Sequence, residues 1–230
     1  MNFLSHYYFD RFEDNPYRIM GMVLPDLIKN ANKNWNPRPE KKEYLFVHDS
    51  LQILIMEGWK RHLQVDRSFH SSAFFRHHTH ILRLKIAPYL ESSAVRPSFV
   101  AHIALELMLD NLLLTELHMD SAQFYHYLKM TDRKVISDFL LLNDIPDSTI
   151  FFKFLDEFIK SKYLESYRNP KDIMYAIGKI CLRVWPDPFN EEQKLQLTLI
   201  LISYLEELRV SFITIFDQIE VQLEPYTEYK

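Results

Sequence analysis

The sequence has very little glycine, with only three glycines in 230 positions. Glycine supplies the positive φ angles and close backbone approaches of tight hairpins, dinucleotide-binding loops and phosphate-binding loops. All-β, Rossmann-like and P-loop folds are therefore disfavoured, and helices become the expected structure. The rest of the composition, 47% hydrophobic and 25% charged, is typical of a folded globular protein rather than a disordered chain.

Cysteine is equally rare, because Cys181 is the only one. It cannot form a disulfide within the chain, so we expect a cytoplasmic protein in which this thiol is a small buried hydrophobe rather than a nucleophile. The opening residues MNFLSHYYFDRFED lack a basic segment and reach Asp10 and Arg11 before an apolar run develops, which is unlike a signal peptide. The longest apolar run, around residues 197–205, is too short to span a bilayer, so no membrane partner is expected.

An excess of basic residues is also missing. The chain has 27 Lys and Arg against 31 Asp and Glu, a formal net charge of −4. Nucleic-acid-binding domains usually carry a strong basic excess, so we expect no nucleic-acid partner. Any anionic ligand would have to be met by a local basic patch.

Prolines and short polar clusters divide the chain into segments whose apolar residues recur every three or four positions. We expect an all-α protein, a single globular domain over residues 1–230 with about seven to nine helices. The expected helical segments are residues 2–9, 16–27, 44–69, 72–88, 97–113, 121–142, 148–167, 170–184 and 191–223. Pro25 should bend or end the second segment, and residues 30–42 should form a surface loop.

Two of these helices carry imidazole and carboxylate side chains at four-residue steps. Such steps keep three side chains within about 80° of arc on one helix face. The residues are His62, Asp66 and His70 in one helix and His102, Glu106 and Asp110 in the other. The second set lies in the apolar run FVAHIALELMLDNLLL, so Glu106 and Asp110 should point into the protein. A buried carboxylate needs a cation, hydrogen bonds or a metal ion, and that helix contains no Lys or Arg.

His6 and Asp26 add an imidazole and a carboxylate from the N-terminal region. This set of ligands without thiolate suits a divalent metal, with Mn²⁺ as the first choice and Mg²⁺, Fe²⁺ or Zn²⁺ as alternatives. In an all-helical protein such a cage is typical of metal-dependent phosphoesterases, in which the ion activates water and neutralises phosphoryl oxygens.

Each candidate also has a structural explanation. Asp26 could cap a helix, His6 could be a packed or capping residue, and His62 with Asp66 could form an ion pair on a solvated helix face. The adjacent residues 48–49, His-Asp, match the doublet that ligates metal in one helical phosphohydrolase superfamily. The histidines of residues 77–80 are more typical of a polar surface cluster.

Several segments, in order, resemble the acyl carrier protein phosphodiesterase family, a relative of the HD-type metal-dependent phosphohydrolases. MNFLSHYYF is similar to the family's N-terminus and places its histidine on His6. GMVLPDLIKN places the family's metal-site acid on Asp26. EGWKRHLQVDRSF resembles a segment with a His and an Asp four residues apart, here His62 and Asp66.

The resemblance continues through the second half of the chain. LELMLDNLLL is similar to a segment in which an acid precedes an Asp-His pair by four residues, which maps onto Glu106 and Asp110. FIKSKYLESYRNPKDIMYAIGKICLRV resembles a later helical stretch. The chain departs from the family pattern at His70, where the family has Asp, and at Asn111, where it has His. Asn is a poor ligand and cannot shuttle protons, so these changes bear on metal preference, substrate or activity.

The resemblance implies an HD-hydrolase-like fold and a specific reaction of lipid metabolism. The phosphodiester between phosphopantetheine and a serine of holo-acyl carrier protein is hydrolysed, giving apo carrier protein and 4′-phosphopantetheine. The implied residues are His6, Asp26, His62 and Asp66 as the catalytic group, Asp26, His62, Asp66, Glu106 and Asp110 as metal ligands, and Arg61, Arg67 and His70 as phosphate-binding candidates.

Two alternatives to this reaction stay open from the sequence. The substrate could be another phosphodiester or a nucleotide, which the outer pocket would decide. The chain could also be a helical binding protein whose site has decayed, as the departures at His70 and Asn111 suggest. The oligomeric state is not specified, although the apolar stripe within residues 201–219 should face the core rather than a dimer partner.

Overall fold

The computed structural model describes residues 1–223, and in that range the chain forms helices and no β-strand. This confirms the all-α prediction. The α-helices are α1 (Phe3–Tyr8), α2 (Pro16–Ala31), α3 (Ser50–Ser71), α4 (Ala73–Ile86), α5 (Pro97–Thr115), α6 (Ser121–Met130), α7 (Arg133–Leu142), α8 (Thr149–Ser161), α9 (Pro170–Cys181), α10 (Glu191–Arg209) and α11 (Ile213–Gln222). Four 3-10 helices accompany them: η1 (Pro39–Lys41), η2 (Glu43–Leu45), η3 (Ala87–Tyr89) and η4 (Tyr163–Arg168).

The described residues hold more helices than the seven to nine expected, because two of the predicted segments are each broken in two. Residues 121–142 form α6 and α7, and the side chain of Asp132 caps α7 by accepting a hydrogen bond from the backbone N–H of Lys134. Residues 191–223 form α10 and α11, which are separated by a turn at residues 210–212. In both cases the apolar spacing continues across the break, so the hydrophobic pattern alone does not reveal it.

The chain folds into two compact units, each built from segments that are distant in sequence. Of the described residues, the first unit contains residues 1–5, 67–119 and 165–223. The second unit contains residues 6–66 and 120–164. A single domain over residues 1–230 stays a prediction, and its last seven residues lie outside the described range.

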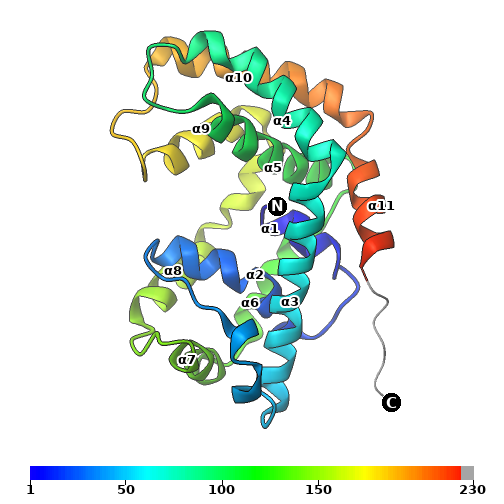
Figure 1. Ribbon diagram of the computed structural model, residues 1–230, viewed down its shortest axis with the longest axis vertical. Helices are drawn as coiled ribbons and strands as arrows, with labels where there is room; N and C mark the ends of the chain where they lie inside the picture. The colour runs from blue at the N-terminus through cyan, green and yellow to red at the C-terminus, as the bar shows by residue number, and fades with distance from the viewer. Residues whose placement is uncertain (224–230) are drawn as a thin grey trace. The chain divides into compact units, whose positions relative to one another are not determined.

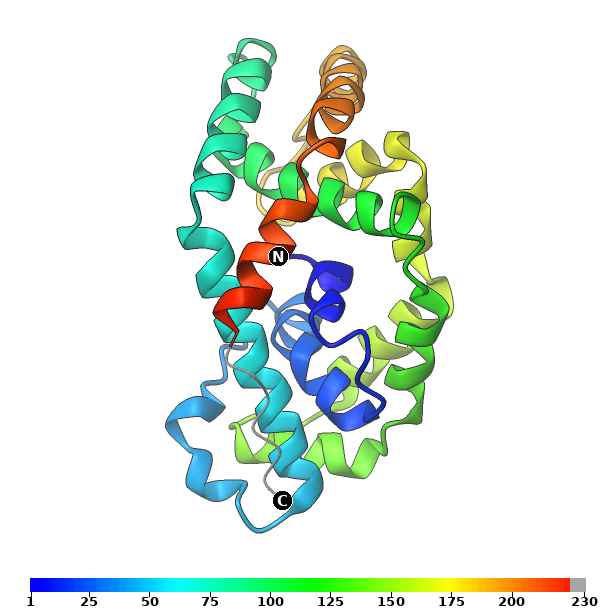
Figure 2. The ribbon, with the colours of Figure 1, turned by 90° about the vertical axis from the view of Figure 1, so that its right-hand side faces the viewer.

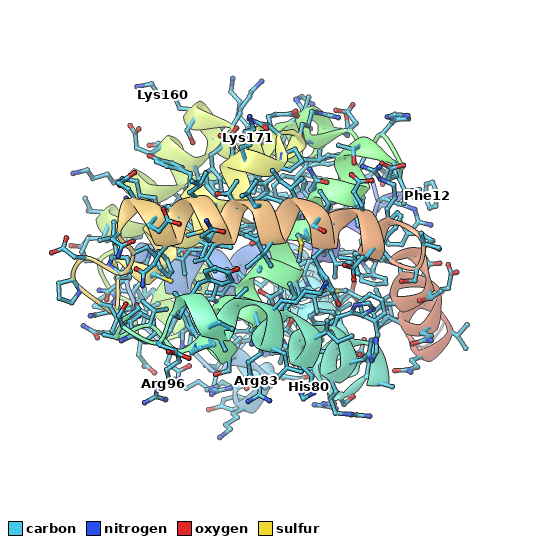
Figure 3. The ribbon with its side chains drawn as sticks, turned by 90° about the horizontal axis from the view of Figure 1, so that it is seen from above. Phe12, His80, Arg83, Arg96, Lys160 and Lys171 are labelled. Atoms are coloured by element: carbon cyan, nitrogen blue, oxygen red, sulfur yellow. The ribbon has the colours of Figure 1, made fainter. Side chains whose placement is uncertain are left out.

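The first unit is organised around α5, which packs against α4 and α9 (Figure 1). Figure 2 shows α5 crossing below α4 and α10, and Figure 3 shows α10 flanked by α4 on one side and α9 on the other. The stripe expected to face the core does so, since Leu201, Leu205, Ile215 and Ile219 are buried. The core prediction for residues 201–219 is therefore confirmed.

Helix α5 is the most apolar helix of the first unit. By length and composition Pro97–Thr115 could cross a membrane, but 67% of its most hydrophobic window is buried inside the structure. Residues 107–114, the second half of this helix, are all buried, and a helix segment surrounded by protein is apolar around its whole circumference.

In the second unit α2 packs against α6 and α8, and it crosses α3 at two glycines. A Cβ atom at Gly21 would lie 2.1 Å from the carbonyl oxygen of Ile55, and one at Gly58 would lie 2.1 Å from the carbonyl oxygen of Arg18. No side chain fits at either position, so the two backbones approach each other directly. This crossing places the turn around Met22 against the part of α3 that carries His62.

Helix α2 begins where its sequence predicts. Asn15 accepts hydrogen bonds from the backbone N–H groups of Tyr17 and Arg18, and Pro16 occupies the first helical position. The expectation that Pro25 ends the helix is wrong, since α2 continues to Ala31. Pro25 removes only one helical hydrogen bond, the one to the carbonyl of Gly21, and burial of the helix on both sides of it offsets that loss.

We expect Gly21→Ala and Gly58→Ala each to lower the free energy of unfolding by about 2–4 kcal/mol, because the new methyl group collides with backbone rather than with a movable side chain. Gly178 is the matched control, since it lies within α9 with no neighbour in reach of an added Cβ. There alanine should stabilise the protein by up to about 1 kcal/mol. Urea denaturation followed by circular dichroism measures the free energy of unfolding of the three variants. Equal changes in this free energy at the three glycines would contradict the close crossing.

A partly buried hydrogen bond between α4 and α10 should make stability depend on pH. The Nδ1 atom of His78 lies 2.7 Å from the Tyr204 hydroxyl, and burial, with a smaller contribution from His77, lowers the pKa of His78 from 6.5 to about 4. Between these pH values the unfolded chain binds the proton more strongly than the folded one. The stability that His78 contributes is therefore full above about pH 6.5 and is lost as the pH falls through about 4.

His78→Gln should remove this dependence while keeping a partner for the Tyr204 hydroxyl. After allowance for solvent screening at this half-buried site, we expect the loss of unfolding free energy between pH 7 and pH 4 to be smaller than in the wild type by about 1–2 kcal/mol. The exposed His80 provides the control, and His80→Gln should follow the wild-type curve. Urea denaturation at pH 7 and pH 4 measures this difference. An equal loss of unfolding free energy in His78→Gln and wild type between the two pH values would refute the assignment.

Candidate metal centre

The structure brings together three of the predicted catalytic residues within the second unit. His6 comes from α1, and His62 and Asp66 lie one turn apart on α3. One ligand atom from each lies within 4.8 Å of the other two. His6 Nε2 is 3.3 Å from Asp66 Oδ1, and His62 Nε2 is 3.6 Å from Asp66 Oδ2. We refer to these three residues as the buried centre.

The ring of His62 is held by a backbone group. Its Nδ1 atom is 2.8 Å from the carbonyl oxygen of Met22. A carbonyl oxygen only accepts hydrogen bonds, so Nδ1 carries the proton and Nε2 presents its lone pair toward Asp66. A carbonyl that holds one ring nitrogen and thereby orients the other is the usual arrangement around a metal-binding histidine.

Both histidines of the buried centre are enclosed, and their rings stack with centroids 3.9 Å apart and planes 16° apart. Burial, together with the neighbouring charge of His6, lowers the pKa of His62 well below 6.5. Burial alone would raise the pKa of Asp66, but the hydrogen bond from His6 and the adjacent imidazoles hold it below its usual range. The side chain of Asp66 is 33% exposed and forms the solvent-accessible side of the centre.

The chemistry of the donor atoms in the buried centre, two imidazole nitrogens and a carboxylate, suits a small divalent ion. With metal–ligand bonds of about 2.1 Å, neighbouring ligand atoms lie roughly 3.0 Å apart in an octahedral site and roughly 3.4 Å apart in a tetrahedral one. The two separations from Asp66, 3.3 Å and 3.6 Å, are close to these values. Two imidazoles and one carboxylate leave further coordination positions for water or substrate.

Asp26, the family's metal-site acid by resemblance, is not one of the three members of the buried centre. It is half-buried within α2, one turn after Met22 and therefore on the same face of the helix. The alternative that it caps a helix is wrong, because Asn15 is the N-cap of α2.

The two arginines expected to bind phosphate are placed differently from each other. Arg61 is mostly buried, and its Nε atom lies 3.6 Å from Asp10 Oδ1, where the buried Arg18 also pairs. It therefore neutralises a buried acid, and its role in phosphate binding stays a prediction. Arg67 is exposed at the solvent-facing side of α3.

A second cluster lies in the first unit and contains His70, His102 and Glu106. Glu106 Oε1 is 3.0 Å from His102 Nε2 and 3.4 Å from His70 Nε2, and the two imidazole nitrogens are 3.2 Å apart. The backbone amine of Met1 also lies 3.1 Å from Glu106 Oε1. Burial would raise the pKa of Glu106, but this amine and the two imidazoles hold it well below 4.5. His70 therefore lies in a group of side chains that could hold a metal ion, and its role in phosphate binding stays a prediction.

Asp110 belongs to neither group of side chains that could hold a metal ion, and its role as a metal ligand stays a prediction. It is fully buried, and its carboxylate accepts hydrogen bonds from the side chains of Asn2 and Ser5 and from the backbone N–H groups of Leu4 and Ser5. These N–H groups start α1 and have no helical acceptor, so the carboxylate caps that helix from a distant part of the chain. These hydrogen bonds satisfy the buried acid.

Other residues singled out in the sequence also have structural roles. Asn111 donates from its side chain to the carbonyl of Tyr167. Asp49 accepts from the backbone N–H groups of Leu51 and Gln52 at the start of α3, so the His-Asp doublet of residues 48–49 is a helix cap. Cys181 is buried and free, and burial raises the pKa of its thiol to about 12, as expected for an unreactive hydrophobe.

Comparison of the chain with protein-family models, with curated proteins and with solved structures gave no match. A proposal for its function therefore rests on the geometry of the site and on the segments that resemble a family.

We expect Asp110→Asn to lower the free energy of unfolding by about 1–3 kcal/mol at pH 5, because both oxygens of the acid accept hydrogen bonds from neighbouring donors, whereas the amide nitrogen cannot accept any. Burial raises the pKa of Asp110 to about 6 against the hydrogen bonds that lower it. The stability it contributes is thus full below about pH 4 and is lost as the pH rises through 6. The difference between wild type and variant should narrow over that range.

Urea denaturation at pH 4, 5 and 7 measures this difference. Asp187→Asn is the control at an exposed acid of the same unit, and it should stay within about 0.5 kcal/mol of wild type. A difference that widens with pH would show that Asp110 acts in the ionised form only.

Proposed function

We propose that this protein is a metal-dependent phosphodiesterase whose ion is held by the buried centre. The observation that carries the proposal is the convergence of His6, His62 and Asp66, with the His62 ring fixed by the Met22 carbonyl. By resemblance, the substrate is the phosphopantetheine–serine diester of holo-acyl carrier protein. Mn²⁺ is the preferred ion and Mg²⁺, Fe²⁺ or Zn²⁺ the alternatives.

The arrangement supports hydrolysis more than a plain ion pair. A surface ion pair of His62 and Asp66 needs no second histidine and no fixed tautomer, whereas a metal site needs both several donors and oriented lone pairs. His6 and Asp26 also lie in segments that resemble the family, so separate parts of the sequence supply the same set of ligand types.

When bound, the ion supplies a water of lowered pKa and neutralises charge on the phosphoryl oxygens. His62 offers its Nε2 lone pair, and its Nδ1–H stays with the Met22 carbonyl throughout. Asp66 supplies negative charge and is the exposed member past which a substrate must approach. His6 lies beside Asp66. It either orients the Asp66 carboxylate or is itself a ligand of the metal.

A second candidate function is a helical binding protein that has lost hydrolysis. The observation in its favour is that Asp110 and Asn111, which the resemblance assigns to the family's site, are both engaged in structural hydrogen bonds. Such a protein would bind no ion at the buried centre.

Titration calorimetry with Mn²⁺ and Zn²⁺ on the metal-stripped protein separates the two. We expect micromolar or tighter binding in the wild type, weakened by about 100-fold or more in His62→Gln and Asp66→Asn, because each removes one of three donors. His102→Gln is the matched control, since it changes the same residue type in the second cluster and should leave the buried centre intact.

Phosphodiesterase activity is then measured on the same proteins. The wild type with Mn²⁺ should release 4′-phosphopantetheine from holo-acyl carrier protein, and the two ligand variants should not. Hydrolysis of bis(p-nitrophenyl) phosphate without cleavage of the carrier protein would show a phosphodiesterase with another substrate. Absence of ion binding in the folded wild type would refute the proposal and leave the binding protein.

A further inference from the structure

A groove of about 850 Å³ lies in the first unit, and none of its lining residues belongs to the buried centre. Its walls come from one face of α4, from the first two turns of α5 and from the segment that follows α9. Figure 3 shows His80 and Arg83 of α4 and Arg96 before α5 pointing outward along the same edge of this unit. The charged and aromatic side chains that matter most in its lining are Arg76, Arg83, Arg96, Phe75, Phe99 and Trp185.

The charge of this groove is opposite to that of the whole protein. The described lining contains Arg76, Arg83 and Arg96 and neither Asp nor Glu, although the chain has a net charge of −4. Within residues 1–223 these three arginines form no ion pair with a carboxylate. Arg133 and Arg209, in contrast, pair with Asp156 and Glu116. Three guanidinium groups without a carboxylate around one groove repel each other and favour an anion between them.

One wall of the groove is aromatic. Phe99 and Trp185 meet edge to face with centroids 5.1 Å apart, and both are only partly buried. Phe75 closes the opposite part of the lining and packs its ring edge to face on His102, 5.0 Å away. Partly exposed aromatic rings beside cations offer a surface on which a planar ring can stack.

The start of α5 adds to the preference for an anion. Arg96 is the N-cap but provides no side-chain hydrogen bond to the first turn, and that turn has no acidic residue. The unsatisfied N–H groups at a helix start carry partial positive charge, which has the same sign as the three arginines.

We propose that this groove binds a nucleotide, with its phosphates on Arg76, Arg83 and Arg96 and its base against Phe99 and Trp185. Guanidinium groups bind phosphate oxygens in pairs, and the aromatic wall accepts the flat base. The volume falls within the range of pockets for small organic ligands, which extends to about 1,000 Å³. A long nucleic acid needs a basic track, which a chain of net charge −4 does not provide beyond this groove. The inference goes beyond the proposed hydrolase and is independent of its metal.

Calorimetric titration of the full chain with ADP, in EDTA and at about 150 mM salt, tests the proposal. EDTA removes divalent ions, so a failure of the phosphodiesterase proposal does not affect the result. We expect ADP to bind the wild type and to bind at least tenfold more weakly to Arg83→Ala/Arg96→Ala. Lys171→Ala/Lys179→Ala is the matched control, because it removes two exposed cations of the same unit on α9 and should stay within twofold of wild type.

A second variant tests the base. Trp185→Leu keeps an apolar residue but removes the ring, so it should weaken ADP at least fivefold and leave pyrophosphate unchanged. The proposal is overturned if ADP does not bind the wild type, if the lysine control loses as much affinity as the arginine variant, or if pyrophosphate binds as tightly as ADP. It is also overturned if only a single-stranded oligonucleotide binds, because the groove would then belong to a nucleic-acid surface.

Discussion

The second unit depends on one close crossing, at which α2 and α3 meet backbone to backbone through Gly21 and Gly58. Helices separated by ordinary side chains stand about 8–10 Å apart, which is too far for a ring on one to reach a carbonyl on the other easily. The glycine crossing shortens this distance, and Met22 is the residue after Gly21 while His62 is one turn after Gly58. The orientation of His62, and with it the geometry of the buried centre, follows from the absence of two Cβ atoms.

Backbone groups also decide how this protein tolerates polar side chains in its interior. Burial lowers the pKa of His62 and a carbonyl of α2 holds its ring, while Asp110 is held by N–H groups at the start of α1. The turn of α2 that contains Met22 also has fewer internal hydrogen bonds than the rest of the helix, because Pro25 has no N–H to donate to the carbonyl of Gly21. A buried imidazole and a buried carboxylate are thus satisfied without a countercharge from Lys or Arg.

The sequence predicts most helix starts, because these depend on residues next to them, such as Pro16 at the start of α2 and Pro97 at the start of α5. It also predicts that His62 and Asp66 share a face of one helix, which follows from their spacing alone. It does not predict the partner of Asp110, since that partner is a backbone segment more than a hundred residues away. Nor does it predict the break at Asp132, because apolar residues continue on both sides. Features that depend on neighbouring residues can therefore be predicted from the sequence. A hydrogen bond to a distant backbone group cannot, because any residue type can supply that group.

The cap supplied by Asp110 also has a consequence for the order of events during synthesis. Helix α1 has six residues, too few to be stable alone in water. The N–H groups of Leu4 and Ser5 find their acceptor 106 and 105 residues later. On the ribosome the first turn of α1 must therefore wait for Asp110 to be synthesised before it can be capped. A segment thus completes its native contacts only after another segment, made 105 residues later, has followed it.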